Sequence, residues 1–468
     1  MQSATEVEQT RLRPKGGFLP SLGGGRAVAM FLVFGGHYLA MGFATPVGNQ
    51  LQAYGDHPQL GATDMFFAMF FGVFIPVPMD YFFILSGFVL AWAYRPDRTA
   101  GEFWLRRFGK VYPAYIVTTL AAFLLFGLMF AKWTSWKIVL THVLLLEAWT
   151  PDQRYNLGLN PVMWTLSAEA FNYLLFPALM LVFVRASKRG LQLTILGCVV
   201  GTFLLPYLGI QAFTLRPPEP PVIAPLEGYP NQFALWFSIM CPLLRLVQFV
   251  LGIALARLML RQGSRFAPNV PVALGIFVVG LAITNLFLPI ELAANGGMLI
   301  PIALLIAALA KADLKGKWSP LRSRPMVFFG KISYCFYAVH ILFIIFTVVQ
   351  VPVPSGAWDL PRLWLYEAGV IPDPKVALPG WANFVLFFVY LSVTVFAAWL
   401  LYATVETPVN RWIRNRAARL RRPVSLPEAP VSPADVPPLA ASAADLDLDA
   451  VSDTRADHAH AGKATQTQ

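Results

Sequence analysis

His37 is the first of a few ionisable side chains that stand inside otherwise apolar stretches of this sequence. It follows Arg26 by eleven residues. In an α-helix this spacing is about three turns and about 16 Å, so both side chains are expected on nearly the same face. A histidine can accept a proton from a hydroxyl group near neutral pH, and an arginine can hold a phosphate or carboxylate bidentately. A structural histidine bonded to a neighbouring helix is the alternative interpretation.

Asp80, Glu169 and His340 also fall within apolar stretches. An ionisable group in a membrane span is costly, so each of these residues is a candidate for a functional site. Thr165, Glu169 and Tyr173 recur every four residues and predict a polar stripe on one helix. Glu169 is a candidate to orient His37 or to bind a sugar hydroxyl group. For His340, an interhelical hydrogen bond is as good an interpretation as direct chemistry.

Arg106, Arg107 and Lys110 form a basic cluster that opens another apolar stretch. Together with Arg26, they are candidates to hold the phosphates of a nucleotide-bearing donor such as coenzyme A. Anchoring of a helix at the cytoplasmic membrane surface explains such clusters equally well.

Two further features concern contacts between helices. Arg245 lies in the middle of an apolar stretch and needs an acidic partner, for which Glu169 is a candidate. Ser86-Gly87 predicts a close approach of two helices, because small side chains let backbones meet.

These residues must be positioned by a membrane domain. Charged residues make up 13% of the 468-residue chain and hydrophobic residues 57%, with a mean hydropathy of +0.58, whereas soluble domains carry about 25% charged residues. We therefore expect an all-α integral membrane protein with about ten transmembrane helices. The expected spans are 26–45, 77–94, 108–131, 162–184, 191–210, 236–260, 270–289, 297–310, 327–350 and 382–404. The segments 65–76 and 133–149 are expected to be interfacial or re-entrant.

The distribution of Lys and Arg predicts the orientation. With the N-terminus inside, the cytoplasmic segments hold 26 basic residues and the outer segments hold six, which favours cytoplasmic N- and C-termini. The same bias accounts for most of the net charge of +11, so we expect no nucleic-acid partner.

The ends of the chain differ from the rest in composition. We expect a disordered cytoplasmic N-terminus over 1–20, a membrane domain over 21–422, and a disordered, acidic, Pro/Ala-rich cytoplasmic tail over 423–468. Three cysteines and the absence of a CxxC or Cys/His ligand pair exclude a disulfide scaffold and predict no metal site.

Taken in order, several motifs resemble acyltransferase family 3, the integral-membrane bacterial acyltransferases that O-acylate cell-surface glycans. The resemblance covers about residues 26–412. The motifs are Arg26-x10-His37, Asp80-Tyr-Phe-Phe-Ile-Leu-Ser86-Gly87-Phe88, Arg106-Arg107-Phe-Gly-Lys110, Trp164-Thr-Leu-Ser167-Ala-Glu169, Gly330-Lys-Ile-Ser333-Tyr334-x5-His340 and Glu406-Thr-Pro408. Lys110 stands where this family usually has an arginine.

The resemblance implies transfer of an acyl group, with acetyl as the expected group, from cytoplasmic acyl-CoA to a hydroxyl of an extracytoplasmic glycan such as an exopolysaccharide or lipopolysaccharide sugar. It implies that His37, Glu169, His340 and Asp80 form the catalytic site and that Arg26, Arg106, Arg107 and Lys110 bind the donor. His37 would be either a general base or a transient acyl carrier. The expected location is the bacterial inner membrane, in contact with lipid and with a polysaccharide synthesis or export system as a partner. The alternative is a multi-span transporter of a glycan intermediate or an organic anion.

Overall fold

The computed structural model of the chain describes residues 19–42, 70–130, 133–214, 231–348, 351–353, 356–358, 366–370 and 380–417. The two expected disordered tails lie outside the described residues, except for Leu19 and Pro20. Pro20 already begins a helix.

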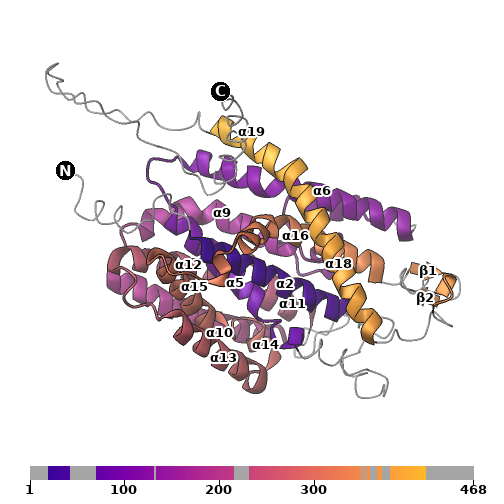
Figure 1. Ribbon diagram of the computed structural model, residues 1–468. Helices are drawn as coiled ribbons and strands as arrows, with labels where there is room; N and C mark the ends of the chain where they lie inside the picture. The colour runs from indigo at the N-terminus through magenta and orange to yellow at the C-terminus, as the bar shows by residue number, and fades with distance from the viewer. Residues whose placement is uncertain are drawn as a thin grey trace, which may run out of the picture.

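The described chain is a bundle of helices (Figure 1). The helices are α2 (Pro20–Gly42), α5 (Val77–Trp92), α6 (Ala100–Phe130), α7 (Trp136–Val143), α8 (Gln153–Asn156), α9 (Trp164–Phe183), α10 (Lys188–Thr214), α11 (Gln232–Leu235), α12 (Pro242–Gln262), α13 (Val270–Phe287), α14 (Ile290–Ala293), α15 (Leu299–Leu314), α16 (Arg324–Val348), α18 (Gly380–Leu401) and α19 (Thr407–Ala417). Single turns of 3₁₀ or π type are η1 (Glu147–Trp149), η2 (Trp236–Met240), η3 (Pro320–Arg322) and η4 (Tyr402–Glu406). The strands β1 (Val351–Val353) and β2 (Gly356–Trp358) pair antiparallel as a small hairpin that the sequence did not predict.

Seven helical segments of the described chain are long and apolar enough to cross a membrane. They correspond to the expected spans that begin at 108, 162, 191, 236, 270, 327 and 382. The other three expected spans are also helical, as α2, α5 and α15. α5 and α15 have only 16 residues each, or about 24 Å, so the count of ten crossings stays a prediction, as does the orientation.

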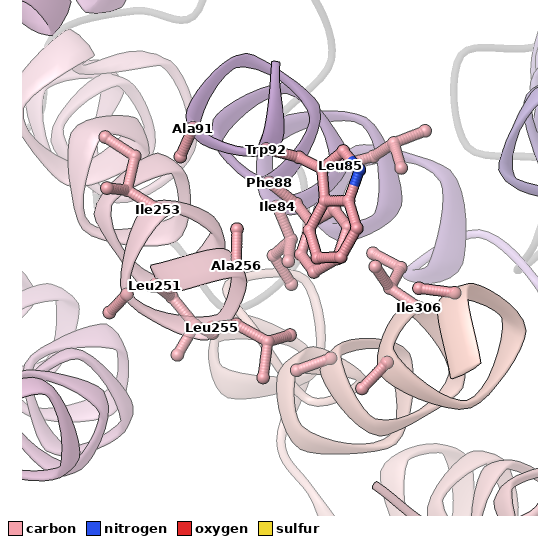
Figure 2. Close-up of a cluster of buried hydrophobic side chains, with 14 of the residues drawn as sticks. Ile84, Leu85, Phe88, Ala91, Trp92, Leu251, Ile253, Leu255, Ala256 and Ile306 are labelled. Carbon is pink, nitrogen blue, oxygen red and sulfur yellow. The ribbon is translucent and has the colours of Figure 1, made fainter. Parts of the chain in front are cut away.

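The main hydrophobic core lies where α5 crosses α12, with α15 beside them. Side chains of the three helices meet at this crossing (Figure 2), among them Ile84 and Phe88 of α5, Leu255 of α12 and Ile306 of α15. All four side chains are at most 5% exposed. An apolar helix that is buried on all sides in this way belongs to the interior of the bundle.

Two glycines allow this crossing to be close. A Cβ atom on Gly87 would lie 2.0 Å from the carbonyl oxygen of Phe249, and one on Gly252 would lie 2.0 Å from that of Ile84. Any larger residue would therefore force the helices apart. The close helix contact predicted from Ser86-Gly87 is confirmed.

A second pair of helices, α2 and α16, also packs through glycines. A Cβ atom on Gly330 would lie 2.1 Å from the carbonyl oxygen of Gly23. Asp313 of α15 holds the first turn of α2, because its carboxylate accepts hydrogen bonds from the main-chain N–H and the hydroxyl of Ser21 at 2.8 and 2.6 Å. The glycine contact fixes α2 against α16, the two helices that carry His37 and His340, and Asp313 fixes α2 against α15.

Candidate active site

His37 and His340 lie side by side across the α2–α16 contact. His340 Nε2 is 3.0 Å from His37 Nδ1, and His340 Nδ1 is 2.7 Å from the main-chain oxygen of Tyr337. A carbonyl oxygen can only accept, so His340 Nδ1 carries a proton. With both rings neutral, His340 Nε2 then accepts a hydrogen bond from His37 Nδ1, and the lone pair of His37 is on Nε2. The pair thus prepares Nε2 to act as a base.

The surroundings of the two rings differ. His340 is fully buried, and its ring stacks on that of Phe336 with centroids 6.1 Å apart and planes 5° apart. His37 is only partly buried. The ring of His340 is therefore fixed by packing, while His37 keeps an accessible side. This asymmetry suits a reacting residue with a supporting partner.

Tyr337 connects the histidine pair to α9. Its ring centroid lies 5.4 Å from that of His340, and its hydroxyl donates to the carbonyl oxygen of Val162 at 2.9 Å. Thr165 Oγ1 lies 2.9 Å from the same hydroxyl. Thr165 begins the polar stripe that the sequence predicted on this helix, so this end of the stripe contacts the tyrosine that neighbours His340.

Glu169, one turn further along α9, lies in a cluster with α5. Ser86 donates a hydrogen bond to Glu169 Oε1, and Asn172 donates to Oε2 at 3.4 Å. Tyr173 also hydrogen-bonds to Glu169. The structure thus gives His340, and not Glu169, as the hydrogen-bonding partner of His37, and a direct role of Glu169 in catalysis stays a prediction.

The basic residues of α6 face different partners. Arg106 pairs with Glu102 at 2.9 Å. Arg107 lies over the ring of Phe103 at 5.9 Å and acts electrostatically on Glu169. This places Arg107 beside the Ser86–Glu169 cluster. A donor bound by Arg107 would therefore lie next to the polar stripe of α9.

The other two predicted donor-binding residues, Lys110 and Arg26, act on different helices. Lys110 acts electrostatically on Cys335 of α16, whose thiol donates to Glu406 Oε2 at 2.9 Å. Arg26 of α2 acts electrostatically on Tyr81 of α5. The predicted donor residues therefore come from α2 and α6.

Asp80 belongs to a separate buried network. It accepts a hydrogen bond from Gln248 at 2.6 Å, and Arg245 lies close enough to act on its charge. Arg245 donates to Gln248 Oε1 at 3.2 Å and to Asn295 Oδ1 at 2.9 Å. Asp80 thus provides the acidic neighbour that Arg245 requires, where the sequence had suggested Glu169. The network joins α5 and α12 to the turn before α15.

Sequence reasoning missed Glu147, which lies in η1 and contacts Tyr115. An acidic residue in the apolar run Leu144-Leu145-Leu146-Glu147-Ala148-Trp149 was the available signal. Among the residues that the structure describes, no group of three His, Cys, Asp or Glu side chains is arranged to hold a metal ion.

Comparisons with known proteins agree with the motifs. A family described as an acyltransferase domain matches residues 19–403. The acyltransferase MdmB of Streptomyces mycarofaciens is 31% identical to the chain over 418 residues, which cover 88% of this chain and 96% of MdmB. No solved structure matches the chain.

Proposed function

Because the chain belongs to the acyltransferase family that matches residues 19–403, we propose that it moves an acyl group from cytoplasmic acyl-CoA to a hydroxyl of an extracytoplasmic glycan. Acetyl is the expected group, and an exopolysaccharide or lipopolysaccharide sugar is the expected acceptor. The single observation that carries the chemistry is the His37–His340 hydrogen bond, which leaves a lone pair on His37 Nε2.

His37 acts as the general base in this proposal. Nε2 removes the proton of the acceptor hydroxyl as its oxygen attacks the thioester carbonyl carbon, and the C–S bond breaks. The coenzyme A thiolate leaves and takes up the proton. His340 Nε2 shares the charge of the protonated His37 ring through their hydrogen bond. The same lone pair would let His37 carry the acyl group transiently, which is the second role that the site permits.

The donor phosphates bind Arg26, Arg107 and Lys110. Arg106 already pairs with Glu102. It therefore adds to the positive charge of this region but does not contact the donor phosphates directly. The pantetheine arm then runs from α6 along the polar stripe of α9 toward the histidine pair. Thr165 and the hydroxyl of Tyr337 lie on this route.

The test uses membrane vesicles from a strain that lacks the gene and is complemented with wild type or His37→Ala. Vesicles receive acetyl-CoA labelled in the acetyl group, and label in surface glycan and free thiol are measured. Removal of the base should lower both by about 10²- to 10⁴-fold at equal protein abundance in the membrane. Normal labelling by His37→Ala would remove His37 from the chemistry. Absence of thiol release in wild type would instead favour the transporter.

A further inference from the structure

The segment that contains α7 and η1 ends inside the bundle, where main-chain groups need partners. The last four carbonyls of a helix have no partner within it. Tyr115 of α6 donates to the carbonyl oxygen of His142 at 2.6 Å, and Tyr112 donates to that of Val143 at 3.0 Å. Hydroxyl groups of α6 thus cap the end of α7.

The turn that follows α7, from Leu144 to Trp149, is held by hydrogen bonds from other helices. Ser167 of α9 donates to the carbonyl oxygen of Leu145 at 2.6 Å and accepts from the N–H of Ala148 at 3.3 Å. Trp236 donates to the carbonyl oxygen of Ala148 at 2.7 Å. Leu145 has a φ of +57°, a left-handed conformation that is unfavourable for a leucine. These surrounding contacts compensate for that strain.

Leu145 packs against the helices of the candidate active site. It lies in one hydrophobic cluster with Leu166 of α9 and Ala338 of α16. Leu166 follows Thr165 in the sequence, and Ala338 follows Tyr337. The hydroxyl groups of Thr165 and Tyr337 lie 2.9 Å apart. The turn from Leu144 to Trp149 therefore forms part of the packing that holds this hydroxyl pair, and Tyr337 lies three residues before His340.

Counting hydrogens assigns the protonation state of Glu147. The hydroxyl of Tyr115 lies 2.6 Å from the oxygen of His142 and 3.0 Å from Glu147 Oε1. It has a single proton, which the shorter contact assigns to the main-chain oxygen; that oxygen can only accept, whereas a carboxyl group can either accept or donate. The contact with Glu147 then needs a proton from the carboxyl group. Glu147 is therefore a neutral acid that donates to Tyr115.

The groups around Glu147 favour its neutral form. Burial raises the pKa of Glu147 to about 8. Burial lowers the pKa of His142 of α7 to about 4, so this neighbour carries no positive charge at neutral pH.

The remaining neighbours do not reverse this preference. Arg154 of α8 is exposed and pairs with Asp152, while α9 contributes the neutral Ser167 and α16 places Tyr334 near Tyr115. The negative end of the α7 dipole, which is close to η1, also disfavours an ionised carboxylate.

We infer that Glu147, as a neutral hydrogen-bond donor to Tyr115, is a positioning residue for acyl transfer. It locks the Leu144–Trp149 turn against α9 and α16 and thereby holds the Thr165–Tyr337 pair beside His340. The link of Glu147 to acyl transfer rests on the proposed function. The protonation state of Glu147 does not depend on it.

The experiment compares wild type with Glu147→Gln and Glu147→Ala between pH 6 and 10, with labelled acetyl-CoA and membrane vesicles. Gln is a matched control because its amide also donates to Tyr115 but does not ionise. Wild-type acylation should fall as the pH rises through about 8, whereas Glu147→Gln should lack this fall. Glu147→Ala should be roughly 10- to 100-fold less active at every pH, with His37 unchanged.

Two activity results would overturn the inference: an identical alkaline fall in wild type and Glu147→Gln, or equal losses in Glu147→Gln and Glu147→Ala. A readout without activity is the infrared C=O band of a protonated carboxylic acid in the purified protein. The difference between wild type and Glu147→Gln should show this band at pH 7 and lose it above pH 8. Absence of the band at pH 7 would contradict a neutral Glu147, whereas absence of thiol release in all three proteins would contradict only the proposed function.

Discussion

At the scale of residues, the direction of one hydrogen bond decides which nitrogen of His37 is available. Because His340 Nδ1 is bound to the carbonyl oxygen of Tyr337, its Nε2 accepts from His37 Nδ1. His340 thus fixes the tautomer and the orientation of the His37 ring. It does so without placing a second charge among apolar helices, where a charge is costly.

We expect His340→Leu to lower kcat while leaving the KM for acyl-CoA nearly unchanged. The substitution removes the ring acceptor of His340 and leaves the main-chain oxygen of Val33 as a hydrogen-bond partner of the His37 ring. Loss of one hydrogen bond costs about 0.5–1.5 kcal/mol, which corresponds to roughly 2- to 13-fold in rate. His340→Gln should retain more activity, since its amide oxygen can accept the same hydrogen bond. Steady-state kinetics of thiol release distinguish the two variants. A change confined to KM would instead place His340 in donor binding.

The sequence predicted the candidate residues better than their partners. His37, Glu169 and His340 were recognised as ionisable groups in apolar stretches, and the i,i+4 stripe from Thr165 was recognised from its spacing. The partnerships of His37 with His340 and of Glu169 with Ser86 join residues 303 and 83 positions apart. Helical periodicity carries information over a few turns only, so it could not pair these residues.

At the scale of elements, α5 shows how a short helix is stabilised inside a membrane domain. It has 16 residues, twelve of which are buried, and at about 24 Å it is shorter than the hydrocarbon core. Protein, rather than lipid, surrounds most of it, so its length need not match the bilayer. Its contact with α12 depends on backbone approach at Gly87 and Gly252.

Gly252→Ala should therefore destabilise the protein, and Gly275→Ala should not. A Cβ atom at Gly252 would meet the Ile84 carbonyl oxygen at 2.0 Å, whereas one at Gly275 of α13 would have nothing within 4 Å. Overpacking of this kind costs about 1–3 kcal/mol, while alanine in an open helix position gains up to ~1 kcal/mol. Thermal unfolding of both variants in detergent tests the difference. Equal Tm values would contradict the close α5–α12 crossing.

At the scale of the whole molecule, hydrogen bonds join segments that are far apart in the sequence at each end of the bundle. Ser21 meets Asp313, Arg257 donates to the Val184 carbonyl oxygen at 3.3 Å, and Lys311 donates to that of Ala267. These segments are the ones that Lys/Arg counting assigned to the cytoplasm.

Contacts at the opposite end join the outer ends of expected spans to the segments next to them. Trp236 donates to Ala148, and Asn285 donates to the carbonyl oxygen of Val73 at 3.1 Å. The orientation inferred from the charge distribution stays a prediction. Hydropathy alone could not show that α2, α5 and α15 would be covered by other helices, because burial by protein depends on the tertiary arrangement.

The orientation of these ends gives the last prediction. Cys198, Cys241 and Cys335 are all buried, so a membrane-impermeant maleimide should label wild type weakly. Arg154, Arg189 and Lys317 are exposed and are suitable positions for single cysteines. With a cytoplasmic N-terminus and ten crossings, Arg154→Cys should react in intact spheroplasts, whereas Arg189→Cys and Lys317→Cys should react only after permeabilisation. Labelling of Lys317→Cys in intact spheroplasts, with Arg189→Cys protected, would show that α10, α12, α13 and α15 do not all cross the membrane. Labelling of Arg189→Cys but not of Arg154→Cys would reverse the orientation and would place the proposed donor-binding residues on the outer side, away from cytoplasmic acyl-CoA.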